Sequence, residues 1–153
     1  MKKRNDRRGL FLLCLLVYAA VMLWLLFCRE NHWSADIPYR QLLAQNANFK
    51  PFYTIGNYVH VVRFGKDGDL VRHCIINLGG NIFLFIPAGL LLPRVFPRLR
   101  RFFPFFFTCL LVMLAVETAQ LLTLLGSFDV DDLILNLFGM ILGYLFCIAN
   151  SRK

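Results

Sequence analysis

Charged side chains are scarce in this sequence, and acidic side chains are scarcer than basic ones. Charged residues make up 17% of the 153 positions and hydrophobic residues 58%, with a net charge of +8. A soluble domain ordinarily has about a quarter of its residues charged, so this shortage excludes an ordinary soluble domain. It indicates an integral membrane protein with little mass outside the bilayer. In such a protein the position of the basic residues matters more than their number, and we do not expect nucleic acid as a partner.

The sequence also lacks the usual motifs of metal, disulfide and nucleophile chemistry. Its five cysteines include no C-x-x-C pair, and its three histidines do not show the spacing of a ligand set. We interpret the cysteines as small apolar residues without a disulfide, and we expect no metal and no cofactor. A G-x-S-x-G nucleophile motif does not occur.

Four apolar runs are each long enough to form a membrane-spanning helix, because about 20 residues at about 1.5 Å each cross the hydrocarbon core. The expected fold class is all-α, a polytopic membrane protein with four transmembrane helices in a bundle and a single domain over residues 1–153. The expected spans are about 10–27, 74–92, 102–125 and 133–149, with a longer outer loop over 28–73. The first run is too long for a signal peptide and no small-x-small cleavage site follows it, so we expect it to be retained.

The basic residues predict the orientation of these spans. They gather before the first span, between the second and third, and after the fourth: Lys2, Lys3, Arg4, Arg7, Arg8; Arg94, Arg98, Arg100, Arg101; Arg152, Lys153. Short segments rich in Lys and Arg remain in the cytoplasm. We therefore expect a multi-pass protein with both termini cytoplasmic.

The outer loop is the one substantial polar segment. Its prolines and glycines, among them Pro38, Pro51 and Gly65, predict short elements rather than a separate domain. Apolar residues over 37–47 have helical spacing. The aromatic residues of the loop suit the level of the lipid headgroups.

Polar residues within the spans are predicted to lie at one depth. Helix rise places Glu117 and Asn81 about 9 to 10 Å below the outer edge of the hydrocarbon core, and Gln120 and Asn136 about 6 to 8 Å below it. Asn77 shares a helix face with Asn81, since the two are four residues apart. An ionisable residue within a span marks a functional site by default, so we expect a polar layer in the outer leaflet.

A structural interpretation of the same residues is open. Asn, Gln and Gly often only hold membrane helices together, and Gly139-x-x-x-Gly143 predicts that another helix approaches the fourth span closely. We expect desolvation to favour the neutral form of Glu117 unless Arg72 or His73 reaches it. A neutral Glu117 hydrogen-bonded to Asn81 or Gln120 would serve only the fold.

Three acidic residues, Asp129, Asp131 and Asp132, precede the fourth span. A carboxylate at a helix N-terminus accepts hydrogen bonds from free backbone N–H groups, and this explains at least one of them. Three acids exceed what a cap requires, so a hard cation or a cationic ligand group is the alternative. Their spacing is not that of an EF-hand.

These segments together form a recognisable pattern. It consists of Asn77-x-x-Gly80-Asn81-x-x-Leu84-Phe85-x-Pro87-x-Gly89, Glu117-x-x-Gln120, and Asp129-Val130-Asp131-Asp132-x-x-x-Asn136-x-x-Gly139-x-x-x-Gly143. Upstream, the residues from Asn48 to Ile55 match N-x-x-P-F-x-T-I. Over roughly residues 10 to 150, the chain resembles the VanZ-like family of bacterial membrane proteins, which is named for a protein linked to teicoplanin resistance.

The resemblance implies a location in the bacterial cell membrane and low-level resistance to teicoplanin or other glycopeptides. Our leading hypothesis is a non-catalytic protein that binds, at the outer leaflet, a lipid-linked cell-envelope component or the acyl tail of a lipidated glycopeptide. The ligand-binding residues would be Asn77, Asn81, Glu117, Gln120, Asp129, Asp132 and Asn136.

Two other classes of function stay open. One is a small membrane enzyme that acts on lipid-linked substrates, with Glu117 as acid/base and the aspartates holding a cation. Against it, no Ser, Cys or His stands beside a plausible base in the spans. The other is a structural subunit of a membrane complex. Neither the ligand nor the oligomeric state follows from the sequence.

Overall fold

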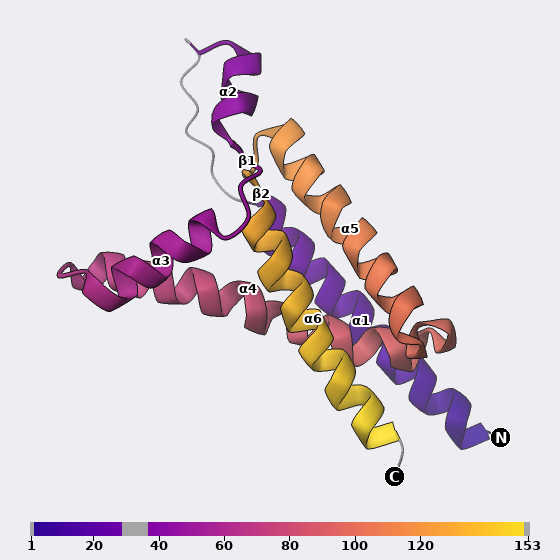
Figure 1. Ribbon diagram of the computed structural model, residues 1–153. Helices are drawn as coiled ribbons and strands as arrows, with labels where there is room; N and C mark the ends of the chain where they lie inside the picture. Colours follow the sequence, from indigo (N-terminus) through magenta and orange to yellow (C-terminus); the bar gives the residue numbers. More distant parts are fainter. Residues whose placement is uncertain (1, 29–36, 152–153) are drawn as a thin grey trace.

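The computed structural model describes residues 2–28 and 37–151 (Figure 1). Arg152 and Lys153, used above to orient the chain, lie outside the described residues. Four helices are long and apolar enough to cross a membrane, which confirms the helical class and the four expected spanning helices. They are α1 (Lys2–Phe27), α4 (Gly68–Val95), α5 (Phe102–Thr123) and α6 (Val130–Ser151).

Short elements fill the segments between these helices. The outer loop contains α2 (Tyr39–Gln45), β1 (Ala47–Asn48) and α3 (Tyr53–Phe64). The 3₁₀ helix η1 (Pro97–Arg100) joins α4 to α5, and β2 (Phe128–Asp129) joins α5 to α6. Both termini lie at the same end of the bundle in Figure 1.

Helix α4 is longer than the expected span 74–92, at both ends. It begins at Gly68 because the Asp67 side chain accepts hydrogen bonds from the backbone N–H groups of Asp69 (3.0 Å) and Leu70 (3.3 Å) and so caps the helix. Its 28 residues measure about 42 Å, whereas the hydrocarbon core is about 30 Å thick. A helix of this length fits by tilting, and Figure 1 shows α4 crossing α1 and α6 obliquely.

The contact between α4 and α6 is the most extensive helix contact in the structure. An added Cβ at Gly139 would overlap the carbonyl oxygen of Ile82, and one at Gly143 would overlap that of Ile86. From the other side, a Cβ at Gly89 would meet the backbone of Met140. The two backbones therefore touch, as the small-residue spacing on α6 predicts.

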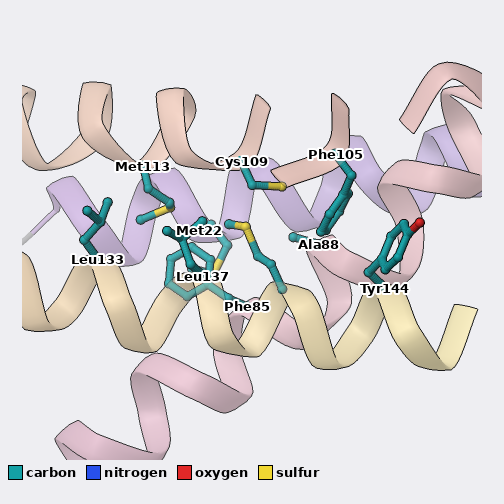
Figure 2. Close-up of a cluster of buried hydrophobic side chains, with 10 residues drawn as sticks. Met22, Phe85, Ala88, Phe105, Cys109, Met113, Leu133, Leu137 and Tyr144 are labelled. Atoms are coloured by element: carbon teal, nitrogen blue, oxygen red, sulfur yellow. The ribbon is translucent and has the colours of Figure 1, made fainter. Parts of the chain in front are cut away.

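A cluster of buried apolar side chains fills the space between the four long helices (Figure 2). Phe105 from α5 stacks on Tyr144 from α6, with ring centroids 4.5 Å apart. The Tyr144 hydroxyl donates to the carbonyl of Arg100, which ties the end of α6 to η1 at 2.8 Å. Other members of the cluster are Met22, Phe85, Ala88, Cys109, Met113, Leu133, Leu137 and Met140.

We predict that Gly139→Ala destabilises the protein by about 1 to 3 kcal/mol, because the new methyl group forces the α4 and α6 backbones apart. Gly80→Ala is the matched control, since nothing lies within 4 Å of a Cβ there. The control should be neutral or gain up to about 1 kcal/mol from helix propensity. Denaturant titration of both variants in detergent micelles measures the free energies. Equal stability of the two variants would contradict a backbone contact between α4 and α6.

Candidate functional site

The site lies at the end of the bundle opposite the termini, where α5 passes into α6 (Figure 1). A short parallel bridge joins the outer loop to this turn, with Ala47 opposite Phe128 and Asn48 opposite Asp129. The Phe128 N–H donates to the Asn46 carbonyl at 2.8 Å. We name Glu117, Asp129, Asp131 and Asp132 the acidic cluster.

Asp129 connects the loop to α6 through its carboxylate. Oδ2 accepts a hydrogen bond from the Thr54 hydroxyl at 2.6 Å. Oδ1 accepts from the Asn48 side-chain amide at 3.2 Å and from the Asp131 backbone N–H at 2.8 Å. The last of these bonds satisfies a free N–H in the first turn of α6, so Asp129 fills the capping role expected for one of the aspartates.

Asp131 caps a different helix, α3. Its side chain is 0% exposed, and its two oxygens accept from the backbone N–H groups of Phe52 and of Ile55, the latter at 3.0 Å. Phe52 is the N-cap residue of α3 and makes no side-chain cap of its own. A carboxylate from α6 therefore holds the start of α3 in place.

Phe52 has a backbone conformation that bulky residues rarely adopt. Its φ is 62°, in the left-handed region, and its ring is 64% exposed. Such strain persists only where neighbouring interactions fix the backbone, and here the Asp131 carboxylate does so. The strained turn directs an aromatic ring away from the protein, next to the exposed rings of Phe49 and Tyr53.

Glu117 is 3% exposed on α5. The hydrogen bond to its Oε2 comes from the Asp129 backbone N–H at 3.4 Å, rather than from Asn81 or Gln120 as the structural interpretation expected. The side chain also lies near the Asp132 carboxylate. Glu117 thus contacts the turn that carries the aspartates.

Asn81 of α4 donates its side-chain amide to Asp132 Oδ1 on α6. Asn136 lies one turn further along α6, on the stripe that continues through Gly139 to the contact with α4. It is 3% exposed, and its Oδ1 has no hydrogen-bond partner among the described residues. The α4–α6 interface therefore holds a buried polar oxygen whose bonding capacity is unused.

Two predicted site residues are directed elsewhere. The Asn77 side chain bonds to His73 on its own helix, through the His73 carbonyl at 2.9 Å. Gln120 donates to the Leu26 carbonyl on α1 at 2.9 Å, where it joins two spans. The structure thus brings together Asn81, Glu117, Asp129 and Asp132, with Asn136 beside them, and leaves out these two.

Tyr58 of α3 belongs to the same region but does not stand out in the sequence. Burial raises the pKa of its phenol, and the carboxylates of Asp132 and Asp129, with the Cys74 thiol, add to the rise. Tyr58 is therefore a neutral phenol at physiological pH, with an O–H that can donate. Within the described part of the chain, no group of three or more His, Cys, Asp and Glu side chains is arranged to hold a metal ion.

Sequence reasoning missed Asn48 and Thr54 as members of the site, and it considered Asp131 only as a helix cap or as a ligand of a cation or cationic group. All three stand in the quoted pattern, Asn48 and Thr54 in the upstream segment and Asp131 in the acidic segment. That pattern was a usable signal for their importance. It could not show that the upstream segment binds the aspartates, because 75 positions separate Thr54 from Asp129.

We predict that Asp131→Asn releases the outer loop. The amide offers one acceptor where two backbone N–H groups bind, and an unsatisfied buried group costs about 1 to 3 kcal/mol. Amide hydrogen exchange over residues 52–56 should therefore accelerate by about tenfold, the equivalent of about 1.4 kcal/mol. Asp69→Asn, an exposed change at the start of α4, is the control. Identical exchange in both variants would show that Asp131 does not anchor the loop.

Comparison with known proteins shows the family to which this chain belongs. Protein VanZ of Enterococcus faecium is 28% identical over 140 residues, which cover 90% of this chain and 74% of that protein. No solved structure matches the chain. A family model described as VanZ/LLP1 matches residues 15–150, and the chain therefore belongs to the VanZ/LLP1 family of membrane proteins.

Proposed function

We propose that this protein binds, without catalysis, a lipid-linked cell-envelope component or the acyl tail of a lipidated glycopeptide at the outer leaflet, and so protects against teicoplanin. In the proposed orientation both termini are cytoplasmic, because the basic segments gather at their end of the bundle. The acidic cluster then faces the outer leaflet. Glycopeptides act on peptidoglycan precursors at that face of the membrane.

The observation that carries the proposal is the buried Oδ1 of Asn136, which has no hydrogen-bond partner in the described part of the chain and lies one turn from the Asn81–Asp132 hydrogen bond. A buried polar atom without a partner costs about 1 to 3 kcal/mol, which a stable packing interface has no reason to retain. A hydrogen-bond donor on a ligand would satisfy this oxygen. We expect the polar end of the ligand to contact Asn81, Asp132 and Asn136 at the end of the α4–α6 contact that lies nearest the acidic cluster.

Exposed apolar side chains give α4 a hydrocarbon surface on the side of the helix that faces away from Asn81. Ile75, Ile76 and Phe83 on α4 are 53%, 58% and 71% exposed. They stand within two turns of Asn81 on a helix that leaves the bundle at an angle (Figure 1). In the proposal, the hydrocarbon part of the ligand lies in the surrounding lipid while its polar end reaches the Asn81–Asp132 pair.

Hydrogen bonding within the cluster favours a binding role over catalysis. Both oxygens of Asp129 and both oxygens of Asp131 accept hydrogen bonds from within the chain. Carboxylates held in this way position the loop and have little capacity left to hold the cation that the enzyme alternative assigns to them. The non-catalytic proposal therefore rests on how these carboxylates are used.

We predict that Glu117→Gln and Asn81→Ala leave membrane abundance near wild type and reduce protection against teicoplanin. Loss of one charged hydrogen bond at the site corresponds to about a tenfold loss of ligand affinity, or about 1.4 kcal/mol. Abundance and teicoplanin susceptibility should be scored in the same cells, with Asp69→Asn as the control outside the site.

The outcomes separate the classes of function. If membrane abundance falls together with protection, Glu117 and Asn81 are needed for folding, and a structural subunit is the favoured class. Unchanged abundance with unchanged protection would refute the proposal. Turnover of cell-envelope lipids by purified protein, lost in Glu117→Gln, would favour the enzyme instead.

A further inference from the structure

The opposite end of the bundle contains an open cavity between α1 and the end of α4. Its volume is about 380 Å³, and its lining is formed by Arg8, Gly9, Leu12, Val95 and Phe96. One basic side chain and four small or apolar residues meet here. The proposed function does not involve this cavity.

Arg8 is held in a defined orientation at the cavity. Its Nε donates to the Val95 carbonyl at 3.1 Å. Val95 is the last residue of α4, where carbonyls have no partner within the helix, so this bond satisfies a free acceptor. A guanidinium carries five N–H donors in one plane. The bond at Nε fixes that plane, and among the described residues the two terminal amino groups make no hydrogen bond, so they can bind a second partner.

The surroundings of the cavity are strongly positive. Residues 8–28 and 94–105 contain five arginines and no Asp or Glu: Arg8, Arg94, Arg98, Arg100 and Arg101. Arg94 and Arg100 bond to the carbonyls of Leu90 and Pro93, and their charges stay near the end of α4. A charge field of one sign attracts an anion and disfavours a cation.

The apolar residues of the lining indicate which kind of anion fits the cavity. Leu12 and Phe96 are 42% and 44% exposed and offer hydrocarbon surface, and Gly9 leaves room because it has no side chain. A small inorganic anion would leave this surface unused, whereas a phospholipid combines a phosphate with a glycerol and the start of its acyl chains. Planar guanidinium groups bind phosphate through paired hydrogen bonds. Basic pockets between membrane helices are known to take anionic headgroups.

We propose that this cavity binds the phosphate of an anionic phospholipid, with the fixed Arg8 guanidinium as its principal donor. The lipid belongs to the leaflet at the end of the bundle that holds both termini. Free phosphate shares the chemistry of the headgroup but cannot use the apolar lining. The experiment therefore has to separate these two sources of phosphate.

The test uses the full chain purified in detergent micelles, with thermal unfolding as readout. Dioleoylphosphatidylglycerol, dioleoylphosphatidylcholine and inorganic phosphate are each titrated against wild type. We expect saturable stabilisation by phosphatidylglycerol, at an apparent affinity at least about tenfold above those of the other two. Comparable stabilisation by inorganic phosphate would identify an ion site without a lipid. No saturable stabilisation by phosphatidylglycerol would overturn the proposal.

Two variants and one control locate the binding. Arg8→Gln removes the donor and should weaken phosphatidylglycerol binding by about tenfold or more. Gly9→Leu fills the cavity without changing the charge, and phosphatidylglycerol binding should again be lost. No atom lies within 4 Å of a Cβ added at this position, so the fold should tolerate the substitution. Arg98→Gln removes an equal charge from an exposed position outside the lining.

The control should bind like wild type. If Arg98→Gln loses as much affinity as Arg8→Gln, or if Gly9→Leu binds normally, the lipid responds to overall charge and the cavity is not its site. Gly9→Leu also keeps the test valid should Arg8→Gln fail to fold. Because all these readouts are of lipid binding, failure here would leave the proposal for teicoplanin unaffected.

Discussion

The backbone contact between α4 and α6 is the constraint on which the rest of the structure depends. Lipid offers no hydrophobic force to drive two apolar helices together, so close approach through small residues has to supply the attraction. Gly139 and Gly143 permit this approach, and the oblique crossing that results lets the 28 residues of α4 fit a bilayer. The same crossing brings Asn81 to Asp132 and encloses Asn136. If α4 and α6 lay further apart, lipid would enter between them and the hydrogen bond between Asn81 and Asp132 would be lost.

The polar residues of the site form two groups with different roles. Asp129 and Asp131 bind the outer loop: they accept bonds from residues 48–55 and hold Phe52 in its strained conformation. Asn81, Asp132 and Asn136 lie in the α4–α6 interface, where one buried oxygen has no partner among the described residues. Part of the acidic cluster, which in the sequence suggests a cation site, thus attaches the outer loop to α6. The strain at Phe52 costs stability, and so does the Asn136 oxygen without a partner among the described residues.

Much of this could be predicted from the sequence, for reasons that differ between features. The lengths of the apolar runs predict the number of spans, because the bilayer has a fixed thickness. The Gly139-x-x-x-Gly143 spacing predicts a close helix partner, because two backbones can approach only where the side chains are small. Helix rise gives Asn81, Glu117 and Asn136 the same expected depth. The rise along a helix axis does not show how the helix is rotated about that axis, so it does not show which neighbour a side chain faces. Gln120 therefore shares the expected depth while facing α1. The link between Thr54 and Asp129 is a tertiary contact without local periodicity, and no pattern in one sequence encodes it.

The most direct test of the central claim replaces Asn136 with Leu, which has the same number of side-chain heavy atoms and the same branching but no polar atom. Asn77→Leu is the matched control, since Asn77 bonds only within its own helix among the described contacts. Unfolding stability in micelles and teicoplanin protection in cells are measured for both variants. If Asn136 serves a ligand, its replacement leaves stability unchanged or raises it, because a buried unpaired oxygen is removed, and protection is lost. A marked fall in stability, or full protection in Asn136→Leu, would contradict the account and show that this oxygen belongs to the fold.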